Sequence, residues 1–251
     1  GFKCSWASNE SCGVGLLLGR RFSEKNITGQ WSPEDAAQGR ALAVRLQSGY
    51  YDFFPVVLYF PPRPCKRCQV PKYISTVQLI CKFLERVLSR FAPASTTPII
   101  MMDLNDGMGL QSLQHLKIKN YYDPATTCIS EACASVEHIE KGAGASVRAI
   151  FESHFLALSS ANCNPSATWW GGKQASSTID YVGIPLSLED AIISGGPLKR
   201  MGKRLQLADT GRMIDHCPTH VSFWYLLQHP PPARLQVNAG VSVDMPDRWD
   251  Q

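Results

Sequence analysis

Short apolar runs, separated by polar segments that carry Pro and Gly, predict several β-strands in the first part of the chain. Residues 13–18 form a run that Gly19 and two arginines end, residues 40–46 alternate between apolar and polar positions, and residues 54–60 precede two prolines. Alternation with a period of two turns one face of a strand toward a core. Residues 26–39 are polar, and we interpret them as a loop or a hairpin.

Apolar positions recur at three- and four-residue steps between residues 73 and 91, which predicts an amphipathic helix. Pro71 precedes this stretch, at a place where a helix tolerates a proline. The helix is followed by the apolar run 99–102, which is typical of a buried central strand. Strand, helix and strand in this order form the crossover unit of layered α/β folds, so the pattern indicates an α/β architecture.

The second half of the chain is less regular. Residues 106–145 are polar with weak helical patterns at 110–116 and 128–139, whereas residues 147–158 carry a second amphipathic helical pattern. Late strands are predicted at residues 179–186 and 219–226. Three consecutive prolines after His229 end the apolar pattern. We therefore expect one domain over residues 1–228 and a Pro-rich linker or tail over residues 229–251.

Composition places the chain among globular proteins. Its 251 residues are 44% hydrophobic and 18% charged, which is enough apolar material for a sizeable core and argues against wholesale disorder. No apolar run approaches the roughly 18 residues that a membrane-spanning helix needs, so no membrane association is expected. The formal net charge of +4 is compatible with nucleic-acid binding without indicating it.

Nine cysteines, an odd number without framework spacing, indicate a reducing compartment and therefore an intracellular protein. Cys65 and Cys68 have the spacing of zinc ligands, but no second pair follows at a suitable distance, and metal binding by this pair stays an open alternative. The chain starts at Gly1, without an initiator Met or a signal-peptide pattern. We expect it to be a segment of a longer protein with further domains.

Three short stretches place ionisable groups beside predicted strands. Asp103 and Asn105 directly follow the central strand, and period-two alternation predicts that both point to the same side. Asp180 interrupts an apolar strand, and a buried carboxylate needs a cation or a hydrogen-bond donor. His216, which follows Asp215 on a predicted loop, is the natural partner, because a carboxylate fixes the tautomer of an imidazole. We expect these groups to converge at one edge of the fold.

Five short motifs in this order resemble the endonuclease/exonuclease/phosphatase superfamily. They are Tyr59-x-Pro61, Asp103-x-Asn105, Thr168-Trp169, Ile179-Asp180-Tyr181 and Asp215-His216-x-Pro218. The resemblance runs from about residue 13 to residue 226 and is closest to the endonuclease domains of non-LTR retrotransposons. It implies an α/β (α+β) fold, a four-layer sandwich of two mixed β-sheets packed face to face with helices outside, here with the first strands missing.

The resemblance also implies a metal-dependent phosphodiesterase, most specifically a DNA endonuclease. The resemblance implies that Asp215 binds a divalent cation, either Mg²⁺ or Mn²⁺. Asp103 activates the attacking water, and Asn105 holds that water and the scissile phosphate. His216, oriented by Asp180, donates hydrogen bonds to a phosphate oxygen as charge develops there. A protein that acts on genomic DNA in this way is expected in the nucleus.

Further residues are assigned to the substrate by the same resemblance. Tyr59 would place a hydroxyl near the scissile phosphate, and Thr168 with Trp169 would line the substrate cleft. A basic cluster precedes the His216 loop and is either a DNA-phosphate contact or a solvated loop. The cluster consists of Lys199, Arg200, Lys203 and Arg204.

The chain departs from the family pattern at several points. The family opens with a strand that bears an Asn and another that ends in a Glu, and neither is found here, since the context of Glu10 does not match. Ile214 replaces a Ser, and Met102 replaces a Gly and is expected to crowd the backbone. One Asp holds Mg²⁺ poorly, so we expect impaired activity. Two alternatives stay open, an inactive remnant or binding module of this fold and a phosphatase acting on small phosphoesters.

Overall fold

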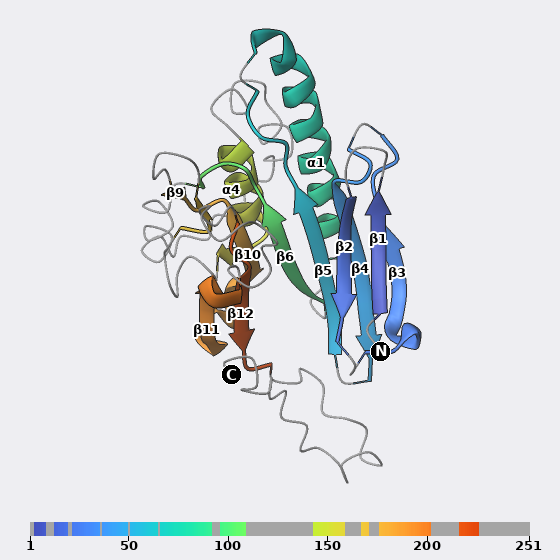
Figure 1. Ribbon diagram of the computed structural model, residues 1–251. Helices are drawn as coiled ribbons and strands as arrows, with labels where there is room; N and C mark the ends of the chain where they lie inside the picture. Colours follow the sequence, from blue (N-terminus) through green and yellow to red (C-terminus); the bar gives the residue numbers. More distant parts are fainter. Residues whose placement is uncertain are drawn as a thin grey trace, which may run out of the picture.

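The computed structural model describes residues 3–8, 13–19, 22–35, 37–49, 51–64, 66–91, 96–108, 143–158, 167–170, 176–201 and 216–225 (Figure 1). Its main element is a six-stranded sheet in the order β3–β4–β5–β6–β10–β7. The strands are β3 (Ile27–Trp31), β4 (Ala41–Ser48), β5 (Tyr51–Tyr59), β6 (Thr97–Asp103), β10 (Asp180–Pro185) and β7 (Leu156–Leu158). The β5–β6 pair is parallel and the others are antiparallel, so the sheet is mixed.

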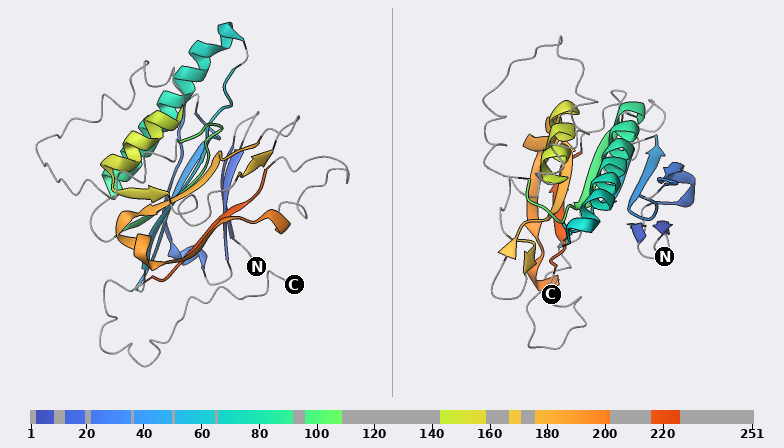
Figure 2. Two further views of the ribbon diagram at one scale, coloured as in Figure 1. Left: turned by 90° about the vertical axis from the view of Figure 1, so that its left-hand side faces the viewer. Right: turned by 90° about the horizontal axis from the view of Figure 1, so that it is seen from above.

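Two helices cover one face of this sheet, α1 (Val70–Phe91) and α4 (Ala143–Ser153) (Figure 2, left). Helix α1 is the crossover between β5 and β6, which is why these two neighbours are parallel. Its apolar stripe, including Val77, Ile80 and Leu84, is fully buried against the sheet. Phe54, Val56 and other side chains of β5 and β6 fill the core beneath it. This core fixes the ends of β5 and β6 relative to each other.

The opposite face carries two separate strand pairs. Strand β1 (Lys3–Ser8) pairs with β2 (Gly13–Leu18), and β2 contacts β4 and β5. Strand β11 (Ile192–Pro197) pairs with β12 (Thr219–Phe223), and β12 contacts β10. A second apolar cluster joins β2 to β4 through residues such as Leu16 and Leu42. The short pair β8 (Trp169–Trp170) and β9 (Ser176–Ser177), with the 3-10 segments η1 (Glu24–Asn26), η2 (Arg67–Gln69) and η6 (Leu186–Ala191), completes the described elements.

The two-sheet α/β sandwich expected from the sequence is confirmed. Each strand predicted before residue 103 is present, and so are α1 and the late strands β10 and β12. Strand β4 is apolar on both faces, because Ala41 and Ala43 meet the helix side and Leu42 and Val44 meet β2. None of the described helices combines the length and apolar character of a membrane span.

One local prediction, that of the second helix, was wrong. The helix predicted at 147–158 ends at Ser153, where Phe155 adopts a positive φ of 52° and residues 156–158 form the edge strand β7. Phe155 and Leu158 continued the helical spacing by coincidence, since a buried three-residue strand has no periodicity of its own. The segment 26–39, expected to be a loop or a hairpin, is the first arm and the turn of a hairpin, because β3 lies within it and pairs antiparallel with β4. The weak helices at 110–116 and 128–139 and the tail at 229–251 lie outside the described residues.

Candidate active site

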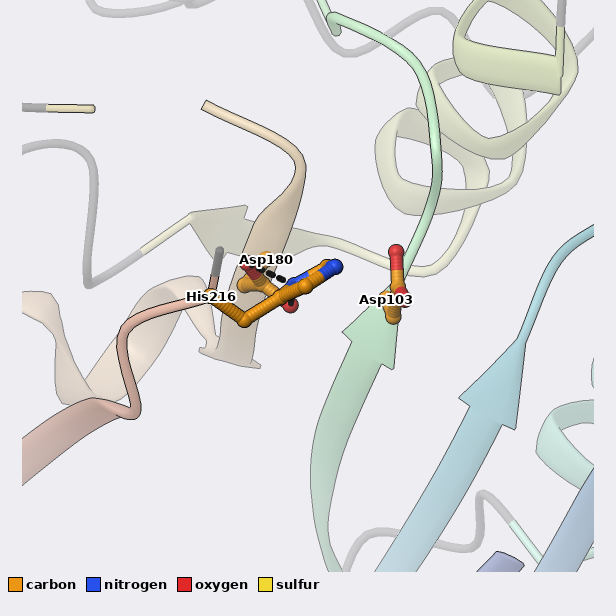
Figure 3. A group of neighbouring side chains, drawn as sticks. All are labelled: Asp103, Asp180 and His216. Carbon is orange, nitrogen blue, oxygen red and sulfur yellow. Dashed lines mark hydrogen bonds and ion pairs between the residues drawn. The ribbon is translucent and has the colours of Figure 1, made fainter. Parts of the chain in front are cut away.

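Three ionisable side chains meet at the edge of the sheet where β6 ends and β10 begins (Figure 3). Asp103 is the last residue of β6 and pairs in register with Asp180, the first residue of β10. His216 comes from the loop before β12 and forms an isolated bridge to Trp169. One ligand atom from each of Asp103, Asp180 and His216 lies within 4.8 Å of the others. The expected convergence of these groups is therefore present.

Asp180 and His216 form a hydrogen-bonded pair. The imidazole Nδ1 lies 3.2 Å from Asp180 Oδ2. An ionised carboxylate only accepts hydrogen bonds, so Nδ1 carries a proton in this arrangement. The ring then directs Nε2 toward Asp103, as Figure 3 shows. The imidazole is 41% exposed and Asp180 is 19% exposed, so the pair is partly accessible from solvent.

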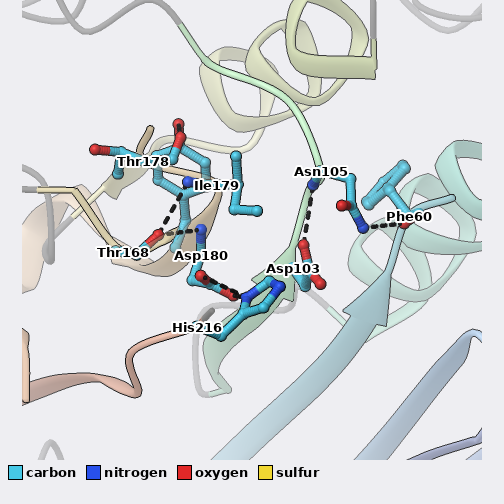
Figure 4. Close-up of polar contacts among 9 residues, drawn as sticks. Phe60, Asp103, Asn105, Thr168, Thr178, Ile179, Asp180 and His216 are labelled. Carbon is cyan, nitrogen blue, oxygen red and sulfur yellow. Dashed lines mark hydrogen bonds and ion pairs between the residues drawn. The ribbon is translucent and has the colours of Figure 1, made fainter. Parts of the chain in front are cut away.

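Thr168 holds both members of this pair in place (Figure 4). Its hydroxyl oxygen accepts the backbone N–H groups of Ile179 and Asp180, each at 3.0 Å. Its carbonyl accepts the N–H of Cys217 at 2.7 Å, next to His216. Thr168 is only 2% exposed, so its side chain offers little surface to a substrate, and its lining of a substrate cleft stays a prediction. Its burial makes it a positioning residue, which the sequence did not indicate.

The turn after β6 separates Asn105 from Asp103. Asn105 has a positive φ of 51°, a conformation that Asn tolerates better than most residues. Its N–H donates to Asp103 Oδ1 at 3.0 Å, and its Nδ2 donates to the carbonyl of Phe60 at 2.9 Å. The Asn105 amide therefore points to the end of β5 instead of sharing the side of Asp103. The predicted alternation fails because the strand ends at Asp103.

Met102 does not crowd the site. Its side chain is buried in the helix-side core, on the opposite face of β6 from Asp103, and is 5% exposed. Strand alternation directs consecutive side chains to opposite faces, so a large residue here adds to the core and leaves the site open. Met102, at the position where the sequence motif has a Gly, thus fills the core on the other side of the sheet.

Tyr181 ties the two loops that flank the site. Its hydroxyl accepts the N–H of Met108 at 3.1 Å and donates to the carbonyl of Thr178 at 2.6 Å. Burial raises the pKa of this phenol above its ordinary value of 10.0, and the nearby carboxylates of Asp106 and Asp180 act in the same direction. Tyr181 was part of a recognised motif, but its role depends on loop contacts that no spacing reveals.

Asp106 anchors the same turn to α4. Its Oδ2 accepts the N–H of Gly144 at 3.2 Å and lies 3.8 Å from Arg63. Gly144 leaves room for this approach, since a Cβ built there would lie 2.3 Å from the carbonyl oxygen of Gly107. The turn that follows Asp103 is thereby fixed against the start of a helix.

Tyr59 lies next to Asp103 across the parallel β5–β6 pair. The guanidinium of Arg40, which precedes β4, lies over its ring at 5.1 Å from the centroid. Sequence reasoning placed Tyr59 near the site but did not single out Arg40. The two residues come from neighbouring strands, so only the sheet register brings them together.

The remaining candidates are only partly described. Lys199 and Arg200 are exposed on a helical turn beside the His216 loop, where the N–H of Leu198 donates to the carbonyl of Pro218 at 2.7 Å. Lys203, Arg204 and Asp215 lie outside the described residues. Cys68 is exposed and free, and Cys65 also lies outside the described part, so their metal binding stays a prediction.

The donor set suits a divalent cation. Two carboxylates offer the hard oxygen atoms that Mg²⁺ and Mn²⁺ prefer, and an imidazole is a common ligand for transition metals. The three groups are half-buried and share one edge of the sheet. The described part of the chain therefore contains a candidate metal centre, without indicating one particular ion.

Comparison with known proteins supports the fold. No protein-family profile matches the sequence, and no curated protein matches it either. The structure is similar to the 3′-5′ exonuclease NExo from Neisseria meningitidis, with TM-score 0.60 and 14% identity over 90% of this chain and 80% of that one. The 3′ phosphatase NExo from Neisseria, bound to a product DNA hairpin, gives TM-score 0.59 with the same identity and coverage.

A third similar structure is the AP endonuclease LMAP from Leishmania major, with TM-score 0.56 and 13% identity over 89% of this chain and 71% of that one. At sequence identities this low, the structural similarity establishes a shared fold and no more. The chain therefore shares the layered α/β fold of these proteins.

Proposed function

We propose that this chain is a divalent-metal-dependent phosphodiesterase that acts on DNA. The observation that carries the proposal is the convergence of Asp103, Asp180 and His216 at one sheet edge of this fold. A carboxylate pair with an oriented imidazole is suited to stabilising charge on a phosphate and to accepting a proton from water. The similarity to an exonuclease, an AP endonuclease and a DNA-bound 3′ phosphatase supports the same class of chemistry.

Each side chain has a proposed task. Asp180 holds the His216 ring through Nδ1, so that Nε2 is available to donate a hydrogen bond to a phosphate oxygen when the ring is protonated. Asp103 accepts the proton of the attacking water. Asp215, the chain neighbour of His216, is the proposed metal ligand. A bound cation would supply positive charge against the phosphate.

A finer proposal concerns the type of enzyme. The motif order is closest to endonuclease domains of non-LTR retrotransposons, which supports an endonuclease over residues 1–228. Residues 229–251 would then be the linker to further domains, and the site of action would be nuclear DNA. Lys199 and Arg200 are exposed beside the His216 loop, and we propose that they contact DNA phosphates.

Plasmid nicking tests the proposal. Wild-type protein is incubated with supercoiled plasmid in Mg²⁺, Mn²⁺ or EDTA, beside Asp180→Asn and His216→Ala variants purified in parallel. Metal-dependent nicking by the wild type alone is the expected result. Equal nicking by the variants identifies a contaminating nuclease, and the absence of nicking contradicts the proposal.

Two further assays separate the alternatives. Phosphate release from inositol phosphates, with plasmid left intact, would identify a phosphatase acting on small phosphoesters. Titration calorimetry with Mg²⁺ and Mn²⁺ addresses the inactive remnant. Micromolar affinity supports an enzyme, whereas millimolar or weaker affinity together with no nicking supports a remnant or binding module.

A further inference from the structure

Arg40 is held at the site edge by two contacts with Tyr59. Its backbone carbonyl accepts the N–H of Tyr59 at 2.8 Å, and its guanidinium lies 5.1 Å from the centroid of the Tyr59 ring. The aromatic face orients the guanidinium plane, because cations are attracted to the electron-rich face of the ring. Arg40 is half-buried, so its charge is partly removed from water.

Nothing in the described part of the chain neutralises this charge. The Nη1 atom of Arg40 is buried and has no hydrogen-bond partner, and the guanidinium forms no ion pair with a described residue. By contrast, Arg45 on β4 binds both carboxylate oxygens of Asp52, at 2.9 and 2.5 Å. A guanidinium with an unpaired Nη1 is costly, so an anion that contacts the accessible part of this side chain would stabilise its charge.

Arg40 lies on the same face of the sheet as the proposed active site. Leu42 and Val44, which follow it at period two, belong to the apolar cluster of the β2 side, and so do Tyr59 and Met101. Asp103 follows Met101 at period two on β6 and therefore shares this face. Strand β4 is two strands from β6. Their separation is about 10 Å at about 4.8 Å per strand.

We propose that Arg40, supported by the ring of Tyr59, binds a second phosphodiester group of the nucleic-acid strand that is cleaved at Asp103 and His216. Guanidinium presents parallel N–H donors that match two phosphate oxygens and keeps its charge at any physiological pH. This inference rests on the proposed function and adds a substrate subsite to it.

DNA binding without divalent metal tests the subsite, since no hydrolysis then occurs. The affinity of a short DNA duplex is measured over a series of salt concentrations for wild type, Arg40→Gln and Arg40→Lys. We expect Arg40→Gln to bind roughly 10-fold more weakly, with a salt slope smaller by about one, as for a lost phosphate contact. Arg40→Lys should retain the salt slope and lose part of the affinity, because an ammonium lacks the paired donors.

Arg86→Gln is the matched control. Arg86 also lies over an aromatic ring, that of Phe83 at 5.7 Å, but it belongs to α1 on the other face of the sheet. The Arg86→Gln variant should bind DNA with the affinity of the wild type. In nicking assays Arg40→Gln should raise KM and leave kcat nearly unchanged.

Stability distinguishes a binding role from a structural one. Removing an unpaired, half-buried charge should leave the urea midpoint of Arg40→Gln unchanged or raise it, whereas a structural arginine would lower it. Wild-type DNA affinity in Arg40→Gln, or affinity lost only with stability, overturns the subsite and leaves the proposed function intact. A wild-type protein that neither binds nor cleaves DNA overturns both.

Discussion

The hydroxyl oxygen of Thr168 accepts the backbone N–H of Asp180 at 3.0 Å. This contact lies at the first residue of β10, the strand that carries the carboxylate. The carbonyl of Thr168 accepts the N–H of Cys217, which follows His216, at 2.7 Å. One buried residue therefore sets the distance between Asp180 and His216. The geometry of the proposed catalytic pair depends on a buried side chain outside that pair.

Replacing Thr168 by Val tests this dependence. Valine has nearly the same shape but accepts no hydrogen bond, so two N–H groups lose their partner. We expect the free energy of unfolding to fall by about 1–3 kcal/mol and kcat to fall more than KM changes. Urea unfolding and plasmid nicking measure the two effects. Thr168→Ser keeps the hydroxyl and should preserve activity, and a fully active Thr168→Val would contradict the positioning role.

Asp180→Asn should impair turnover without unfolding the protein. An amide does not fix the protonated Nδ1 of His216 as a carboxylate does, so we expect kcat to fall by roughly two to four orders of magnitude. His216→Ala should cost a similar factor. The double variant should be hardly worse than either single one, because residues that act as a unit are not additive. Single-turnover nicking rates check this, and independent, multiplying losses would argue against a pair.

Gly144→Ala should destabilise the turn after Asp103. The new Cβ would lie 2.3 Å from the carbonyl oxygen of Gly107, so α4 and the turn must move apart. We expect a loss of about 1–3 kcal/mol in unfolding free energy, together with reduced nicking. Gly49→Ala is the matched control, because nothing lies within 4 Å of its Cβ position. Equal thermal midpoints for the two variants would contradict the close packing.

The raised pKa of Tyr181 predicts that the protein loses stability at alkaline pH. Burial raises its pKa in the folded state above 10.0, so the unfolded chain releases the phenolic proton first as the pH rises past 10.0. The free energy of unfolding is therefore full below pH 10 and declines through the window between the unfolded and folded pKa values. Tyr181→Phe should show a shallower decline. Urea unfolding below and above pH 10 measures it, and identical slopes would exclude Tyr181 as a cause.

The sequence predicted the fold because its apolar patterns are strong. Helix α1 shows one clear period, and the parallel β5–β6 pair follows from the helix between them. The meeting of Asp103, Asp180 and His216 was also predictable. Strand ends bring distant polar residues to one edge, and an isolated carboxylate in an apolar strand needs a partner.

Other features depend on tertiary contacts and were not predictable. The direction of Asn105 follows from a left-handed backbone conformation just after the strand. The role of Thr168 follows from its burial, and the placement of Arg40 follows from the register between β4 and β5. A periodicity argument describes one element at a time, so it does not reveal contacts between elements.

Asp103 belongs to a different strand from Asp180, and His216 lies 36 positions beyond Asp180, so these ligands assemble only when β6 and β10 have paired. A divalent ion that prefers this cluster therefore has little affinity for the unfolded chain and acts after the sheet has formed. At a hundredfold excess over its Kd, such an ion would add about 2.7 kcal/mol to the stability. It would do so by slowing unfolding, with refolding unchanged. Chelation should accordingly shorten the lifetime of the native state even in the absence of any nucleic acid.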